Sequence, residues 1–182
     1  MYSVLDTFGE DLTKKTYVTN PAISREQEIK RAMVVLLTPE KSALLVGKPG
    51  IGKTAIVEGI AYLIQQGLAP NALKNCRIIK INATALMGTM LVDGREVLVA
   101  TMLVEELKRT TNTIVFIDEI HMLIGNKTEG PMDLANILKA GLDSTMSHQA
   151  DTYDIMTTFG WYEINNVKES QIKQTYNKIK DK

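Results

Sequence analysis

The sequence predicts an α/β domain with a central parallel sheet. Three apolar, strand-like runs, at 43–46, 77–81 and 113–117, alternate with helical stretches at 53–66 and at roughly 95–109. This alternation is typical of parallel strands joined by right-handed crossovers. A glycine-rich loop directly follows the first run, at the point where such a fold passes from strand to helix.

The first predicted helix spans 24–37, with Ser24 as its N-cap and Pro39 closing it. Its apolar residues recur at helical spacing, and they are Ile29, Ala32, Met33, Leu36 and Leu37. The next helix, at 53–66, carries a similar apolar face formed by Ile56, Ile60, Leu63 and Ile64.

The C-terminal part has weaker patterns. A helix over 133–142 is predicted after the breaker Gly130-Pro131, and a polar strand is expected around 153–157. Residues 170–182 fit a helix, whereas 176–180 alone fit a short edge strand, so periodicity leaves both open.

The loop between the first strand and its helix matches the pattern G-x-x-x-x-G-K-[ST] in full. Its glycines permit positive φ angles, so that backbone N–H groups can turn toward one point at the N-terminus of the following helix. An isolated glycine-rich turn is the alternative, but here every position of the pattern is filled in order. We therefore predict a loop that binds nucleotide phosphates, formed by Gly47, Pro49, Gly50, Ile51, Gly52, Lys53, Thr54 and Ala55.

The run 113–117 ends in two carboxylates, Asp118 and Glu119, which is the Walker B pattern. Asp118 is expected to hold Mg²⁺ together with the Thr54 hydroxyl. Lys53 would neutralise charge on the β- and γ-phosphates, and Glu119 would orient and polarise the attacking water. Two solvated acids at the end of a strand are the alternative for this pair alone. Its combination with the phosphate loop favours an ATPase with ATP and Mg²⁺ as cofactors.

The composition argues against several other classes of function. The net charge is zero over 182 residues, which offers no basic patch for nucleic acid at the level of composition. Apolar runs such as 34–37 are too short to cross a membrane. The single Cys76 cannot form an internal disulfide and is expected to be a small packed residue. Residues 1–11 lack the features of a signal peptide, so we expect a cytoplasmic location, with an organelle stroma or matrix as the alternative.

Several segments resemble the first nucleotide-binding domain of the Clp/Hsp100 AAA+ chaperones. They are GKPGIGKTAIVEGIA at 47–61, FIDEIH at 116–121, FGEDLT at 8–13, NPAISR at 20–25 and MDLANILK at 132–139. The resemblance implies a P-loop AAA+ three-layer sandwich that binds ATP or ADP, acts on protein substrates and assembles with other AAA+ subunits. The assembly implied is a homo- or hetero-oligomeric ring, a hexamer in this family.

The resemblance also implies roles for two residues outside the loop. Ile23 would line the adenine pocket, although the family's glycine is replaced by Ser24. In the C-terminal part, Thr157 or Thr158 aligns with the sensor-1 residue that contacts the γ-phosphate, and we assign Thr158. No domain boundary is marked, so we expect a single AAA+ large subdomain over 1–182, with a lead-in at 1–20 and a divergent part at 143–182.

Two departures from the family pattern bear on activity. Gln174-Thr175 stand where an arginine pair is expected, and no arginine occurs after Arg109. In such ATPases an arginine from a neighbouring subunit contributes about 10³ to 10⁵ in rate. At 88–94, Leu91 or Val92 replaces the tyrosine of the family's pore loop, which grips a translocating polypeptide.

These observations lead to one favoured function and two alternatives. The favoured function is an ATP-binding and ATP-hydrolysing AAA+ module of a Clp-type chaperone. The first alternative is a regulatory nucleotide switch with impaired hydrolysis. The second is a clamp-loader-type relative acting on DNA, which the neutral charge and the Clp-like segments disfavour.

Overall fold

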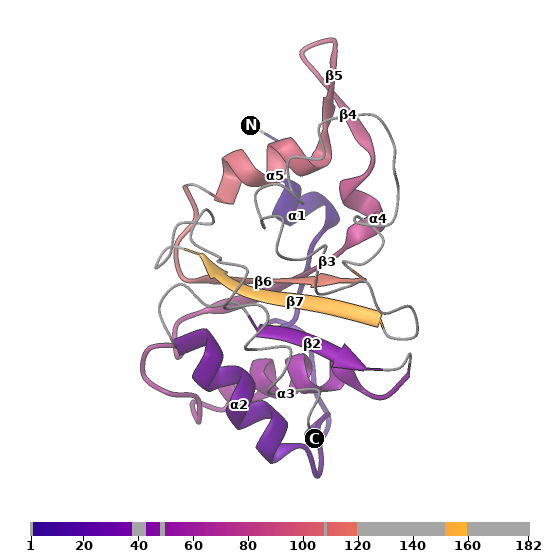
Figure 1. The fold of residues 1–182 in the computed structure, drawn as a ribbon. Coiled ribbons are helices and arrows are strands. Elements are labelled where there is room, and N and C mark those ends of the chain that lie inside the picture. Colours follow the sequence, from indigo (N-terminus) through magenta and orange to yellow (C-terminus); the bar gives the residue numbers. More distant parts are fainter. Residues whose placement is uncertain (1, 38–42, 48–49, 108, 120–151, 160–182) are drawn as a thin grey trace.

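The computed structural model describes residues 2–37, 43–47, 50–107, 109–119 and 152–159 (Figure 1). The elements in chain order are α1 (Val4–Phe8), β1 (Glu10–Asp11), α2 (Glu26–Leu37), β2 (Ala43–Gly47), α3 (Lys53–Gln65), β3 (Arg77–Asn82), α4 (Ala83–Leu86), β4 (Thr89–Val92), β5 (Arg95–Leu98), α5 (Val99–Leu107), β6 (Thr113–Asp118) and β7 (Thr152–Phe159). The predictions for 133–142 and 170–182 lie outside the described residues. Within those described, no helix has the length and apolar character needed to span a membrane.

Five of the described strands form one sheet, in the order β1-β3-β6-β7-β2. β3 and β6 pair in parallel, from Arg77 opposite Thr113 to Asn82 opposite Asp118. β7 is antiparallel to both β6 and β2, so β2 runs in the same direction as β3 and β6. The three strands predicted to be parallel, β2, β3 and β6, therefore do run in one direction, whereas β1 and β7 are antiparallel to their neighbours. Side chains alternate in the same way in both strand directions, so the pattern at 153–157 could predict a strand but not its direction.

Helices cover both faces of the sheet and produce three layers (Figure 1). α2 and α3 lie on one face, and α1, α4 and α5 lie on the other. The core under α2 and α3 includes Ile29, Leu36, Ile56, Val57, Ile60, Ile78, Ile114 and Phe116. β6 is buried from Thr113 to Ile117, as its continuous apolar run predicts. Cys76 is packed in the same core, as expected, and burial raises the pKa of its thiol.

Helix α2 begins at Glu26 and not at Ser24. Ser24 has a φ of 64°, in the left-handed region, whereas an N-cap residue has extended backbone. The prediction of Ser24 as an N-cap is therefore wrong. The chain turns just before the helix, where the Arg25 N–H donates to the Ala22 carbonyl at 3.3 Å.

The predicted helix at roughly 95–109 is shorter than expected. Arg95–Leu98 forms β5, which pairs antiparallel with β4, and helix α5 starts only at Val99. The turn between these strands has positive φ angles at Asp93 and Gly94, of 49° and 77°. An Asp-Gly pair with both angles positive is a strong hairpin signal, which outweighs the helical spacing of the residues that follow. The resulting hairpin projects beyond α4 and α5 (Figure 1).

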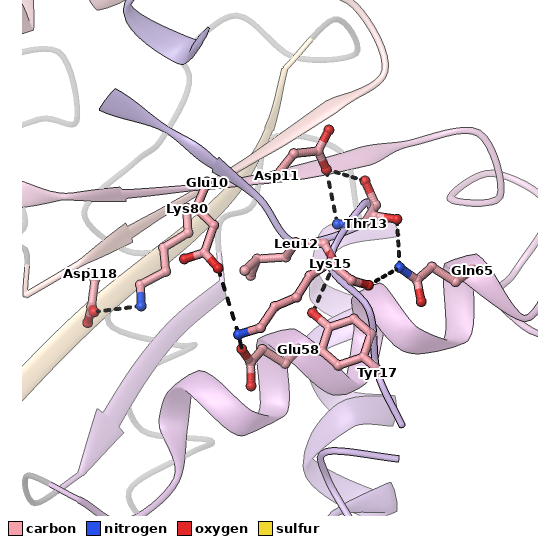
Figure 2. A network of polar contacts seen from close by, with 10 residues as sticks. All are labelled: Glu10, Asp11, Leu12, Thr13, Lys15, Tyr17, Glu58, Gln65, Lys80 and Asp118. Atoms are coloured by element: carbon pink, nitrogen blue, oxygen red, sulfur yellow. Dashed lines mark hydrogen bonds and ion pairs between the residues drawn. The ribbon is translucent and has the colours of Figure 1, made fainter. Parts of the chain in front are cut away.

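The lead-in is fastened to α3 by polar contacts (Figure 2). The Gln65 amide donates to the carbonyls of Thr13 and Lys15, both at 2.7 Å. The Lys15 ammonium lies 2.6 Å from Glu58, and the Tyr17 hydroxyl donates to the Leu12 carbonyl at 2.9 Å. Residues 10–17 therefore hold a defined position along the outer surface of α3.

Candidate nucleotide-binding site

The predicted phosphate loop leads directly into α3. Gly47 ends β2, and Gly50 and Gly52 have φ angles of 77° and 97°. These left-handed angles explain why glycine is needed at both positions. Pro49 lies outside the described residues.

The first turn of α3 has no side-chain cap, since its N-cap residue is Gly52. The Gly52 carbonyl accepts a hydrogen bond from Ile56 N–H at 3.3 Å. The first amides of a helix have no partner within the helix, so an uncapped first turn after glycines suits an anion. Lys53 is buried, at 9% exposure, whereas Thr54 and Ala55 are half-buried.

The segment that carries Ile23 lies beside this loop. The Arg25 guanidinium donates from Nη2 to the Ile51 carbonyl at 2.9 Å, and its Nη1 lies 3.3 Å from Glu28 Oε1. Ile23 is 71% exposed, which is unusual for a large apolar side chain. Through the Arg25 bond, the segment that carries Ile23 contacts the phosphate loop, and the adenine-pocket role of Ile23 stays a prediction. Sequence reasoning missed Arg25, because a bond to a carbonyl in a distant loop leaves no local pattern.

Asp118 and the phosphate loop lie at the same edge of the sheet. Ile155 of β7 pairs with Leu44 on one side and with Ile117 on the other. Because β2 and β6 run in the same direction, the loops that follow Gly47 and Asp118 leave the sheet at the same edge. The two motifs therefore lie at the same edge of the sheet, with β7 between their strands, as a shared nucleotide site requires.

The two carboxylates after β6 differ in their surroundings. Asp118 is half-buried, and its Oδ2 lies 3.6 Å from the Lys80 ammonium of β3 (Figure 2). Glu119 is exposed and has a φ of 57°, a left-handed conformation that L side chains seldom adopt. The chain therefore leaves the extended path of β6 at Glu119. Lys80 is the second residue that sequence reasoning missed.

Thr158 is not brought to this edge. It pairs with Ile114, four residues before Asp118 along β6, and Thr152 is the β7 residue that pairs with Gly47. The antiparallel direction of β7 thus directs its C-terminal threonines toward the opposite edge. We therefore do not retain the assignment of Thr158 to the γ-phosphate.

The available ligands fit Mg²⁺. In the described part of the chain, no group of three or more His, Cys, Asp or Glu side chains could enclose a metal ion. Mg²⁺ does not need such a group, because it keeps much of its water shell and binds through one or two protein oxygens and the phosphates of its nucleotide. The Thr54 hydroxyl, in the first turn of α3, and the Asp118 carboxylate, at the end of β6, are oxygens that would suit such an ion.

Comparison with known proteins identifies the family of this chain. The protein-family model described as "ATPase family associated with various cellular activities (AAA)" matches residues 43–177. The chain belongs to this family of ATPases. The match begins at β2 and so includes the phosphate loop, α3 and the Asp118-Glu119 pair of this AAA chain.

The relatives of this AAA chain confirm the resemblance to Clp/Hsp100 nucleotide-binding domains. The chaperone protein ClpB of Wolinella succinogenes is 41% identical over 142 residues, which are 76% of this chain and 17% of that protein. The ATP-dependent Clp protease ATP-binding subunit ClpE of Bacillus subtilis is 38% identical over 143 residues, which are 76% of this chain and 20% of that protein. The chain therefore spans a fifth or less of the length of these curated relatives.

A solved structure confirms the P-loop AAA+ fold. A closed-state cryo-EM reconstruction of Hsp104 with ATPyS and FITC casein is similar to this chain with a TM-score of 0.60 and 33% identity. The match covers 78% of this chain and 25% of that one.

Proposed function

We propose that this AAA chain binds ATP together with Mg²⁺ and hydrolyses the nucleotide. The observation that carries the proposal is the convergence of a complete phosphate loop and of the Asp118-Glu119 pair at one edge of the sheet. The uncapped first turn of α3 at the end of that loop supports it further.

Each side chain has a distinct role in this proposal. Lys53 would neutralise charge on the β- and γ-phosphates, and Glu119 would orient the attacking water and accept its proton. The Thr54 hydroxyl and Asp118 would hold Mg²⁺. When bound, this ion supplies charge neutralisation at the phosphate oxygens. The exposed Ile23 would cover the adenine ring.

The wider role is that of a Clp-type chaperone module that couples nucleotide state to protein remodelling. The similarity to ClpB, ClpE and Hsp104 supports it. We propose that the chain assembles with other AAA+ subunits into a ring, by family resemblance a hexamer, and that the substrates are proteins. Nucleic acids and membranes are not proposed as partners. We also propose a cytoplasmic, reducing location, which the free Cys76 supports.

A slow nucleotide switch is the second candidate. It is favoured by the absence of arginine after Arg109 and by Leu91, which is 69% exposed on the hairpin where the family has its pore-loop tyrosine. An arginine from a different subunit would restore the missing charge. The favoured function then predicts hetero-assembly, whereas the switch predicts slow turnover in any assembly.

The experiment compares nucleotide affinity and ATP turnover in the wild type, Lys53→Ala, Glu119→Gln and the control Lys74→Ala. Lys74 is an exposed lysine just before β3, at the opposite edge of the sheet, so its removal matches the charge change at Lys53. We expect Lys53→Ala to lose ATP affinity, and Glu119→Gln to keep it while turnover falls by about 10² to 10⁴. Unchanged ATP affinity in Lys53→Ala would refute nucleotide binding at this site. Rapid, Glu119-dependent turnover in the isolated chain would exclude the switch.

A further inference from the structure

A lysine other than Lys53 contacts Asp118, the carboxylate that we assign to the metal. Lys80 lies on β3, and its Nζ is 3.6 Å from Asp118 Oδ2 (Figure 2). Lys80 is opposite Phe116 in the parallel pairing and Asn82 is opposite Asp118, so the two charged residues are diagonal neighbours on one face of the sheet. Their side chains are 26% and 21% exposed, so water screens the pair only in part.

This face of the sheet is the one that α3 covers. Ile78 precedes Lys80 by two residues on β3, and Phe116 precedes Asp118 by two residues on β6. Both apolar residues belong to the core that contains Ile56 of α3. The ammonium of Lys80 therefore lies on the same side of the sheet as the helix that begins with Lys53 and Thr54.

We propose that Lys80 competes with Mg²⁺ for Asp118 and thereby lowers the metal affinity of the nucleotide site. This inference rests on the proposed function. A carboxylate that already neutralises an ammonium attracts a divalent cation less strongly, and an ammonium beside the same carboxylate repels that cation. In this proposal, Lys80 leaves Asp118 when the metal binds. In the absence of metal, the lysine holds the carboxylate in place.

A second acceptor for the displaced lysine is close by. Glu10 of β1 is the residue directly opposite Lys80 in the antiparallel pairing, so their side chains share one face. Figure 2 shows the Lys80 side chain with Asp118 on one side and Glu10 on the other. Glu10 Oε1 lies 3.7 Å from the Lys15 ammonium, which also contacts Glu58 of α3 at 2.6 Å. A displaced Lys80 would therefore join the charge network that fastens the lead-in to α3.

The experiment measures Mg²⁺ binding to the ADP-loaded protein by isothermal titration calorimetry, so that no hydrolysis is needed. It compares the wild type with Lys80→Met, Lys80→Arg and the matched control Lys74→Met, which removes the same charge at the opposite edge of the sheet. We expect Lys80→Met to bind Mg²⁺ about two- to fivefold more tightly, the upper part of the range that a partly exposed ion pair contributes. Lys80→Arg keeps the positive charge and should stay near the wild type, as should Lys74→Met.

Three results would overturn the inference. The first is equal or weaker Mg²⁺ affinity in Lys80→Met, with ADP affinity intact, which would leave the proposed function standing. The second is an equal gain in Lys74→Met, which would show a general charge effect in place of competition at Asp118. The third is a wild type that binds no ADP at all, and in that case the proposed function and the inference both fail.

Discussion

Replacing Gly59 with alanine should destabilise the protein, although alanine is the better helix former. Gly59 is buried in the middle of α3. A Cβ atom added there would lie 2.6 Å from the Cβ of Ala22 and 2.7 Å from Cδ1 of Ile29. Carbon atoms pack best at about 3.5 to 4.0 Å, so both contacts are too short by roughly 1 Å. The Ile29 methyl can rotate away, but the Ala22 Cβ can move only with its backbone.

The magnitude follows from two opposing effects. Overpacking a tight site costs about 1 to 3 kcal/mol. The better helix propensity of alanine returns up to about 1 kcal/mol. We therefore expect Gly59→Ala to lower the free energy of unfolding by about 1 to 2 kcal/mol, measured by urea denaturation. Nucleotide affinity should fall as well, because Ala22 precedes Ile23 and a displaced Ala22 moves the proposed adenine contact.

The matched control is a double-mutant cycle with Ala22→Gly, which removes the Cβ atom of Ala22 that the new Cβ at position 59 would contact too closely. Gly59→Ala should cost about 1 kcal/mol less in the Ala22→Gly background than in the wild type. If Gly59→Ala were instead as stable as the wild type in both backgrounds, the space between α3 and the segment before α2 would be loose. The close approach that we describe would then be refuted.

Three further outcomes are expected. Arg25→Ala should weaken ADP binding about three- to tenfold, because it removes the hydrogen bond to the Ile51 carbonyl. Glu28→Gln keeps that hydrogen bond and should leave ADP affinity unchanged. Equal losses of affinity in the two variants would contradict this role of Arg25. Glu106→Ala should lower the free energy of unfolding by about 2 kcal/mol, because the Glu106 carboxylate accepts hydrogen bonds from the Ser3 hydroxyl and from two amides of α1. Unchanged hydrogen exchange at those two amides would argue against this role of Glu106. Burial raises the pKa of Tyr17 above its unfolded value, so its stabilising contribution is present below a pH of about 10 and is lost as the pH rises further. Tyr17→Phe should therefore flatten the alkaline loss of stability in pH-dependent unfolding, and an unchanged profile would exclude Tyr17 as its source.

The central site could be predicted because its signals are local. The glycines at 50 and 52 adopt the positive φ angles that the loop pattern requires, and β6 is buried along the whole run that precedes Asp118. A pattern of consecutive residues determines such features, since backbone freedom and burial act at each position in turn.

The remaining features depend on contacts between distant residues. The direction of β7 is fixed by its two neighbouring strands, and the Lys80–Asp118 pair is fixed by the register of β3 against β6. Arg25 reaches a carbonyl that lies 26 residues further along the chain. The periodicity of apolar residues along the sequence does not predict these contacts between distant residues. The hairpin at β4 and β5 is different, because Asp93-Gly94 is a local signal that could have predicted it.

The left-handed backbone at Glu119 has a consequence for engineering. A residue with a Cβ atom loses of the order of 1 kcal/mol in this backbone conformation, and glycine does not. Glu119→Gly would remove this backbone strain, but it would also remove the carboxylate proposed to activate water, together with the contacts of that side chain. A directed-evolution experiment that selects for heat tolerance alone, without measuring ATP turnover, therefore risks replacing the proposed catalytic carboxylate of Glu119.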